Sequence, residues 1–97
     1  MRIIARKTLR EFWKKHPGAQ KPLQAWYADA KQAHWKNPKD IKNVYCNASI
    51  AANNRVVFNI KGNSYRLVTA INYDFEIIYV RFVGTHKEYD NIDVATV

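Results

Sequence analysis

The sequence predicts a single α+β domain in which two N-terminal helices pack on one face of an antiparallel sheet, in the order β-α-α-β-β-β. Three observations support this prediction. Apolar residues recur at helical spacing through the first third of the chain. From residue 55 onward the apolar period changes to two, as in strands. The length of 97 residues suits one domain, assigned to residues 1–97, which can bury a core without disulfides.

The N-terminal segment Arg2–Ala5 contains β-branched residues and predicts a first strand. A first helix follows, because Thr8-Leu-Arg-Glu11 has the spacing of a capping box. One apolar stripe continues along it: Leu9, Phe12, Trp13 and His16. Pro17-Gly18 ends this helix. His16 is interpreted as a packing residue that suits the negative end of the helix dipole.

A second helix is predicted from Pro22, a residue that suits the first turn of a helix. Its apolar stripe comprises Leu23, Trp26, Tyr27, Ala30 and either Ala33 or His34. Asn37-Pro38 is expected to close it, because the residue before proline resists the helical conformation. Residues 40–45 are expected to form a short helical turn, and Asn47–Asn54 a loop.

Three strands are predicted after this loop, joined by short turns into an antiparallel meander. Apolar residues alternate over residues 55–61, 65–72 and 77–83. Gly62-Asn63 supplies the positive φ of the first turn, and residues 72–74 form the second. Thr85-His-Lys-Glu88 then repeats the capping-box spacing, which predicts a short helical turn. This turn would place His86 and Tyr89 on one side, at the end of the last strand.

The charge is strongly positive and unevenly distributed. The net charge is +8, and residues 1–45 hold eleven Lys and Arg against three acids. Such a domain favours polyanions or an acidic protein partner. No signal peptide and no membrane-spanning segment is recognisable, so a soluble, cytoplasmic protein with no membrane partner is expected. The single cysteine, Cys46, fits a reducing compartment.

The available chemistry points to phosphodiester transfer without a metal. No Cys/His cluster, phosphate-binding glycine loop, nucleophile elbow or Mg²⁺-binding set of acids is recognisable, so no metal and no cofactor are expected. RNA carries its own nucleophile, the 2′-OH, and needs only a base, an acid and cations around the phosphate. The candidate catalytic residues are His86, Arg66, Lys61 and Tyr89.

The sequence resembles the HigB family of bacterial toxins, within the RelE/ParE superfamily. The resemblance lies in Arg55-Val-Val-Phe-Asn-Ile-Lys-Gly-Asn-Ser-Tyr-Arg-Leu-Val68, Ile71-Asn-Tyr-Asp74 and Arg81-Phe-Val-Gly-Thr-His-Lys-Glu-Tyr-Asp-Asn-Ile-Asp93. Residues 8–17 and 23–27 resemble it too. The resemblance implies a RelE-like sheet packed on two helices, and an mRNA interferase that often acts on the ribosome. It also implies a HigA-like antitoxin with a helix-turn-helix domain, through which alone the toxin would contact operator DNA.

The same resemblance assigns roles to residues. Tyr65-Arg66-Leu67 matches the Tyr-Arg-Leu of the superfamily, which makes Arg66 the phosphate-stabilising arginine. His86 stands where RelE has an arginine, which implies that His86 takes over acid–base work. Lys61 and Tyr89 are further members of the predicted site. Three other cations are predicted to bind RNA: Arg55, Arg81 and Lys87. The strand pattern leaves open which face Arg81 occupies.

Two other functions stay open at this point. One is a non-catalytic toxin of the ParE type that inhibits gyrase, although His86 and Tyr89 favour catalysis. The other is a basic RNA- or DNA-binding module, whose affinity would fall steeply with salt.

Overall fold

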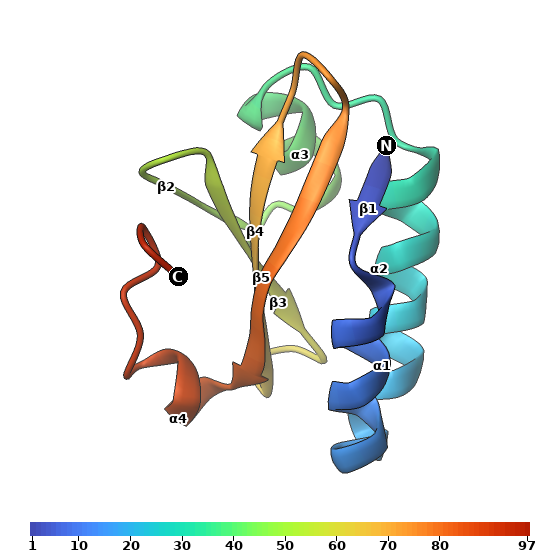
Figure 1. Cartoon of the computed structure of the whole chain (residues 1–97), viewed down its shortest axis with the longest axis vertical. Coiled ribbons are helices and arrows are strands. Elements are labelled where there is room, and N and C mark those ends of the chain that lie inside the picture. The colour runs from blue at the N-terminus through green and yellow to red at the C-terminus, as the bar shows by residue number, and fades with distance from the viewer.

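A five-stranded sheet forms the centre of the molecule in the computed structural model, which describes residues 1–97 (Figure 1). The strands are β1 (Arg2–Ile4), β2 (Ser49–Ala51), β3 (Arg55–Ile60), β4 (Tyr65–Asn72) and β5 (Ile77–Thr85), in the order β1-β5-β4-β3-β2. The predicted antiparallel meander β3-β4-β5 is confirmed. At one edge β1 pairs with β5 in parallel, and at the other β2 pairs with β3 in antiparallel fashion.

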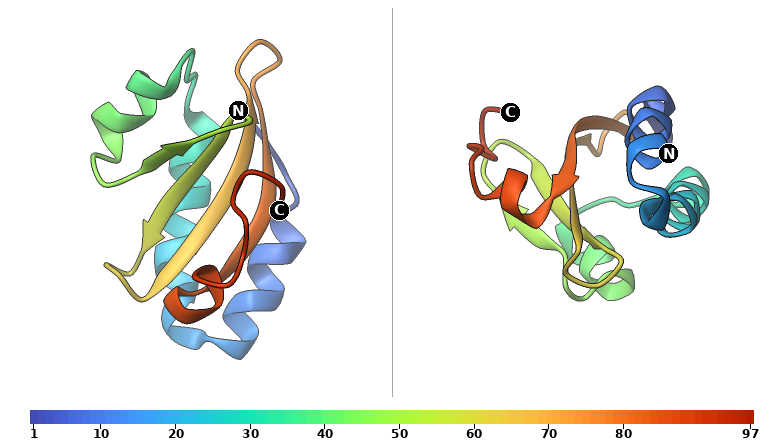
Figure 2. Two further views of the ribbon diagram at one scale, coloured as in Figure 1. Left: turned by 90° about the vertical axis from the view of Figure 1, so that its left-hand side faces the viewer. Right: turned by 90° about the horizontal axis from the view of Figure 1, so that it is seen from below.

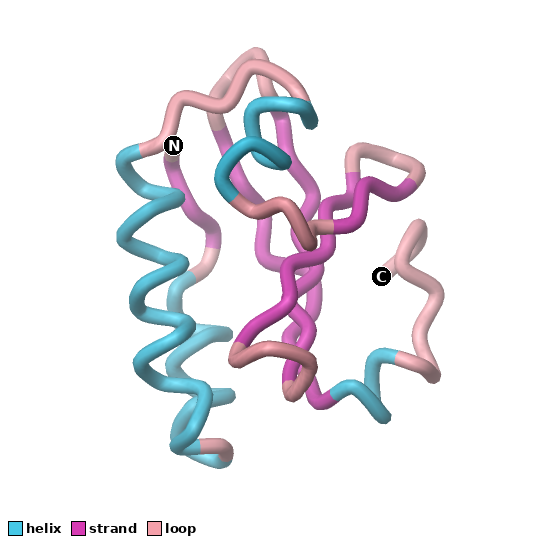
Figure 3. The backbone as a smooth tube through the Cα atoms, turned by 180° about the vertical axis from the view of Figure 1, so that it is seen from behind, coloured by secondary structure: helices cyan, strands magenta, loops and turns pink.

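The helices divide between the two faces of the sheet (Figure 2). On one face lie α1 (Arg6–Lys15) and α2 (Gln20–Gln32), joined by a 3₁₀ turn, η1 (Pro17–Ala19). A third helix, α3 (Pro38–Val44), leads into β2 (Figure 3). The last helix, α4 (His86–Tyr89), and the C-terminal segment lie on the opposite face. The predicted α+β class with two N-terminal helices is confirmed, and no helix has the length and apolar character needed to cross a membrane.

The core fills the space between the sheet and α1/α2, because one side of every long strand is apolar. Its strand residues are Val56, Phe58, Ile60, Leu67, Ile71 and Ile78. The helices contribute Leu9, Trp13, Leu23, Trp26 and Ala30, as their predicted stripes require. Phe58 is the centre of an aromatic cluster, with ring centroids 5.4 Å from Trp26, 6.2 Å from Trp35 and 5.3 Å from Tyr45. Burial of such rings is the main stabilising contribution.

The opposite side of the sheet, which we call the outer face, presents Val57, Asn59, Arg66, Val68 and Phe82. These residues alternate with the core residues and pair across the strands, Asn59 with Arg66 and Val68 with both Val57 and Phe82. A bulge interrupts the pairing after Val68, since Thr69 pairs with Val80 and leaves Arg81 without a partner. The C-terminal segment crosses part of this face (Figure 2).

The predicted start of α1 and the predicted end of α2 need correction. The first helix begins at Arg6 with Ala5 as an uncapped N-cap, so Thr8 lies inside the helix and its predicted capping box is wrong. The helix begins early because Arg6 already stacks over the rings of Trp13 and Tyr27, at 5.8 and 5.4 Å.

The second helix begins at Gln20 and ends at Gln32, before the predicted Asn37-Pro38. The amino group of Met1 donates hydrogen bonds to the carbonyl oxygens of Ala30, Lys31 and Ala33, which satisfies carbonyls at the end of α2. Pro38 instead begins α3, with Asn37 as its N-cap, so the helix expected at residues 40–45 is confirmed with an earlier start.

Two connections also differ from the expectation. Residues 47–54 are only partly a loop, because β2 and a three-residue turn form a hairpin in which Asn53 and Asn54 have φ of 60° and 59°. Asparagine tolerates this left-handed conformation well. In the turn between β3 and β4 the positive φ values belong to Lys61 and Gly62, at 53° and 62°, rather than to Gly62 and Asn63.

Candidate functional site at the end of strands β4 and β5

Arg66 lies on the outer face near the start of β4, opposite Asn59 on one side and Gly84 on the other. Its Nη1 donates to the carbonyl oxygens of Asn63 and Tyr65, at 3.2 and 3.3 Å. The other guanidinium nitrogens have no hydrogen-bond partner in the protein. The guanidinium is therefore anchored at one nitrogen and keeps the rest of its donors for a ligand.

Helix α4 begins with the predicted capping box, which is confirmed. The Thr85 hydroxyl accepts from the Glu88 N–H at 3.2 Å, and Glu88 Oε1 accepts from the Thr85 N–H at 2.8 Å. The hydrogen bond from the Thr85 backbone N–H, followed by the interaction with the Thr85 side chain, holds the pKa of the Glu88 carboxyl below its usual value, and the nearby His16 and Lys15 act in the same direction. The His86 N–H donates to the Ser64 oxygen at 3.2 Å, so α4 is fastened beside the start of β4.

Gly84 shapes the same end of the sheet. A β-carbon at this position would lie 2.5 Å from the Phe82 ring and 3.2 Å from the Glu88 carboxylate. Glycine thus lets the Phe82 ring and the capped end of α4 approach the strand opposite Arg66. The sequence prediction did not include this role, although a glycine before a capping box is a signal for a close approach.

Tyr89 and His86 both come from α4 but make different contacts. The Tyr89 ring lies 5.8 Å from the guanidinium carbon of Arg66, within cation–π range. His86 Nδ1 lies 3.1 Å from Asp90 Oδ2, and its other ring nitrogen has no protein partner. No hydrogen bond or ion pair joins the His86 side chain to Arg66 or Tyr89. Asp90 was missed by the sequence prediction, although its i,i+4 spacing from His86 on a short helix was a usable signal.

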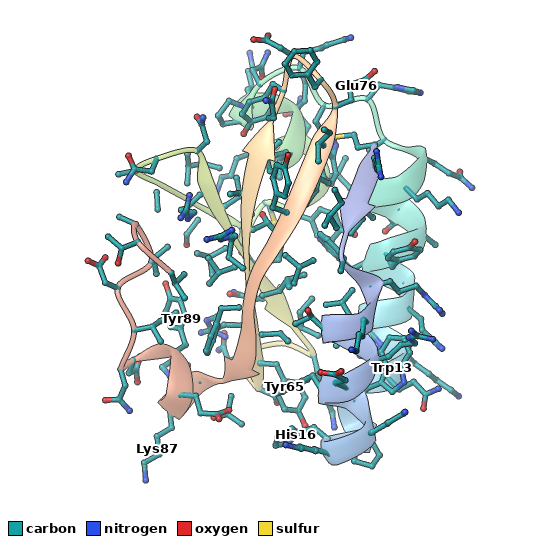
Figure 4. All side chains as sticks on the ribbon, in the orientation of Figure 1. Trp13, His16, Tyr65, Glu76, Lys87 and Tyr89 are labelled. Carbon is teal, nitrogen blue, oxygen red and sulfur yellow. The ribbon has the colours of Figure 1, made fainter.

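Lys61 lies apart from this group. A β-carbon on Gly18 would be 2.7 Å from its amine and 3.5 Å from the Tyr65 hydroxyl, which places the amine beside η1 on the helix side of the sheet. Tyr65 packs against the core, whereas its neighbour Arg66 points to the outer face. Lys87 is exposed on α4 and extends away from the fold (Figure 4).

Arg55 and Arg81 share one acceptor. Arg55 Nη2 and Arg81 Nε both donate to the main-chain oxygen of Val97, at 2.8 and 3.1 Å. Arg81 therefore reaches the same face as Arg55, because the bulge lets its side chain turn there. Both arginines hold the C-terminal segment on the outer face.

The arrangement can bind an anion and move a proton. Arg66 offers donors in a planar fork, His86 offers an imidazole nitrogen, and Tyr89 offers an aromatic ring and a hydroxyl. No three side chains of His, Cys, Asp or Glu gather in a way that could hold a metal ion. Cleavage of a phosphodiester by phosphoryl transfer requires groups of these kinds.

Comparison with known proteins identifies the family. Residues 19–92 match HigB_toxin, the RelE-like toxic component of a toxin-antitoxin system. The chain belongs to the HigB toxin family. It is 30% identical over 92 residues to the mRNA interferase toxin HigB of Escherichia coli strain K12, which covers 93% of this chain and 88% of that protein. The mRNA interferase HigB of Shigella flexneri matches equally, and that of Escherichia coli O6:H1 strain CFT073 is 24% identical over 95% of this chain and 91% of its own length.

Membership of the HigB family has a direct consequence for partners. A toxic component of a toxin–antitoxin system has an antitoxin that neutralises it, so this chain has an antitoxin partner. The match begins within η1 and ends after α4, and it therefore includes Arg66, His86 and Tyr89.

Proposed function

We propose that this HigB-family toxin is an endoribonuclease that cleaves mRNA by attack of the RNA's own 2′-OH, without a metal ion. The relatives that match nearly the whole chain are named mRNA interferases. The observation that best supports this proposal is the contact of Arg66 with Tyr89 beside the capped α4, because a guanidinium, a phenol and the imidazole of His86 then come from the same end of the sheet.

Arg66 is the proposed phosphate ligand. Two of its guanidinium nitrogens are free of protein partners, and a planar fork can bind two phosphate oxygens at once. The negative charge on those oxygens grows as the 2′ oxygen attacks, so a preorganised cation stabilises the transition state more than the ground state. The Tyr89 ring restricts where the guanidinium can move.

His86 is the proposed acid–base group. Asp90 engages its Nδ1, which leaves the other ring nitrogen for the proton of the 2′-OH or of the departing 5′ oxygen. Asp90 orients the ring in the manner of the third member of a catalytic triad. The Tyr89 hydroxyl has no protein partner and supplies a second donor, or its ring stacks on a base.

The partners follow from the same proposal. A HigA-like helix-turn-helix antitoxin would neutralise the toxin and carry the pair to operator DNA. The target is mRNA in the cytoplasm, and the ribosome would present it in the open, single-stranded form that base recognition needs. The excess of Lys and Arg over the first 45 residues suits such polyanionic surroundings.

Mapping of mRNA 5′ ends after induction tests the proposal. Wild-type protein should create new ends within minutes, whereas His86→Ala and Arg66→Ala should create few while remaining folded. The loss should be about 10²- to 10⁴-fold for His86→Ala, as for removal of a general acid or base. It should be about 10²- to 10³-fold for Arg66→Ala, as for removal of a group that stabilises charge in the transition state. Intact mRNA together with a rapid change in DNA supercoiling would instead identify a gyrase poison. Addition of purified protein to mRNA with and without ribosomes decides whether the ribosome is required.

A further inference from the structure

Three polar groups lie close together where β3 ends and β4 begins, on the side of the sheet that faces α1 and η1. The Lys61 amine and the Tyr65 hydroxyl both lie against Gly18. The His16 ring lies 5.7 Å from the Tyr65 ring and stacks on Phe12 at 4.4 Å (Figure 4). None of these three polar groups has a side-chain hydrogen bond or ion pair within the protein. They form a cluster, Lys61/Tyr65/His16, whose donors are available to a ligand.

The backbone around this cluster indicates that the amine is held there for a reason. Lys61 has φ of 53°, a left-handed conformation that favours glycine or asparagine. A lysine kept in such a position is a reason to look for a role of its side chain. The absence of a side chain at Gly18 leaves room for the amine, since a β-carbon there would lie 2.7 Å from it.

The chemistry of the cluster suits a phosphate. A lysine amine binds phosphate as a point charge, and imidazole and phenol add directed donors. Lys14 and Lys15 end the neighbouring α1 and add positive potential. Two acids lie near His16, and both are already engaged: Glu88 by the capping box, and Glu11 by Lys7 at 3.7 Å. Successive strand residues point to opposite faces of a sheet, so Tyr65 and Arg66 lie on opposite faces of β4. This cluster and the proposed active site are therefore on the two faces of the sheet at the same end of β4.

We propose that Lys61, Tyr65 and His16 form a second phosphate-binding subsite, which holds the RNA backbone where it passes around the end of the sheet from the scissile phosphate at Arg66. This subsite rests on the proposed ribonuclease function and adds to it. It separates Lys61 from the chemistry: the amine contributes affinity for the RNA strand, whereas Arg66 and His86 act on the bond that is cleaved.

Equilibrium binding of a single-stranded, fully 2′-O-methylated oligoribonucleotide tests the subsite, because this probe cannot be cleaved. Lys61→Ala should weaken binding about fivefold, the effect of one exposed charge pair. It should also reduce the slope of log K against log salt by about 0.7, as expected for one lost phosphate contact on a single strand. Lys61→Arg should retain most of the affinity. Lys39→Ala, at an exposed position of α3 at the other end of the molecule (Figure 1), is the control with the same loss of charge and should bind as wild type does.

Tyr65→Phe and His16→Gln separate a built subsite from general electrostatic attraction. Both leave the Lys61 amine in place and remove one directed donor beside it, so each should weaken binding, by less than Lys61→Ala does. Equal binding by the Lys61→Ala and Lys39→Ala variants, or wild-type binding by both Tyr65→Phe and His16→Gln, would overturn the subsite even if the protein cleaves mRNA. Conversely, the expected binding losses in a protein that leaves mRNA intact would support the subsite and refute the proposed ribonuclease.

Discussion

The guanidinium carbon of Arg66 lies 5.8 Å from the centre of the Tyr89 ring, so β4 and α4 meet through a cation and an aromatic face. The two residues are distant in sequence and are brought together by two local devices. Pairing of Arg66 with Gly84 fixes the strand ends, and the capping box at Thr85 turns the chain back toward them. The site therefore depends on a four-residue helix that could not persist alone.

Replacement of Tyr89 should show whether its ring or its hydroxyl matters. Tyr89→Phe retains the cation–π contact and should lower the cleavage rate less than Tyr89→Leu, which leaves the guanidinium unrestrained. If the hydroxyl donates a proton, Tyr89→Phe should instead lose about 10²-fold or more. Single-turnover cleavage of a short mRNA, under the conditions that support wild-type activity, measures both. Equal and full activity in the two variants would remove Tyr89 from the site.

Two threonines offer a matched test of helix capping. Thr85→Ala should lower the free energy of unfolding by about 0.5–2 kcal/mol, since it removes the acceptor for the Glu88 N–H. Thr8→Ala changes the same Thr-x-x-Glu pattern but should cost less than about 0.5 kcal/mol, because Thr8 caps nothing. Chemical denaturation measures both, and amide exchange should locate the Thr85 effect in α4. Similar losses for the two variants would show that the cap is not formed in solution.

Local patterns explain which parts of the fold the sequence predicted. The meander and the α4 capping box depend on residues close in sequence, so their spacing was sufficient. The identical spacing at Thr8 gave a wrong start for α1. The helix begins earlier, where Arg6 contacts the rings of Trp13 and Tyr27. The short β2 hairpin was missed because Ser-Ile-Ala has no clear period and its turn relies on the left-handed Asn53 and Asn54.

The candidate site was predicted residue by residue but not in its arrangement. Strand alternation, continued through Lys61, would put that amine on the outer face with Arg66. The strand ends at Ile60, however, and the positive φ of Lys61 breaks the alternation. Arg81 could not be placed because its face depends on a bulge that has no sequence signal here. Asp90 could have been predicted from its i,i+4 spacing relative to His86.

The Glu88 carboxyl should make stability depend on pH in a defined direction. Its pKa is lower in the folded protein than in the unfolded chain, so its contribution is complete above the usual carboxyl pKa of about 4.3 and is lost as pH falls through the folded value. Glu88→Gln keeps a neutral acceptor that does not titrate. At neutral pH the free energy of unfolding of the wild type should exceed that of Glu88→Gln by no more than about 0.5 kcal/mol, because the Glu88 side chain is exposed.

Urea unfolding of both proteins between about pH 7 and about pH 3 checks this dependence. The other carboxyls are the same in the two proteins, so their contributions cancel when the two free energies of unfolding are subtracted. This difference should shrink toward low pH; a difference that stays constant or grows would contradict the lowered pKa of Glu88.

Asp90→Asn should reveal how His86 is held. The amide retains a similar shape beside Nδ1 but no negative charge, so the ring loses an orienting ionic partner. We expect a loss of about tenfold in single-turnover rate with little change in RNA affinity, well short of the loss for His86→Ala. Asn91→Ala is a neighbouring control, since the only side-chain hydrogen bond of Asn91 goes to the Lys87 oxygen. A greater loss for Asp90→Asn than for His86→Ala would assign the chemistry to Asp90 itself.

Arg55 distinguishes a structural role from a role in RNA binding. The sequence predicted an RNA contact, yet in the structure Arg55 donates to the oxygens of Asn53 and Val97. Arg55→Ala should therefore cost about 1 kcal/mol of stability and accelerate amide exchange in residues 92–97, with the salt dependence of RNA binding unchanged. Arg10→Ala removes the same charge from an exposed position on α1 and should alter neither property. A smaller salt slope for Arg55→Ala, with exchange in the C-terminal segment unaltered, would restore Arg55 to the RNA-binding surface and leave Arg81 and Asn53 to hold that segment.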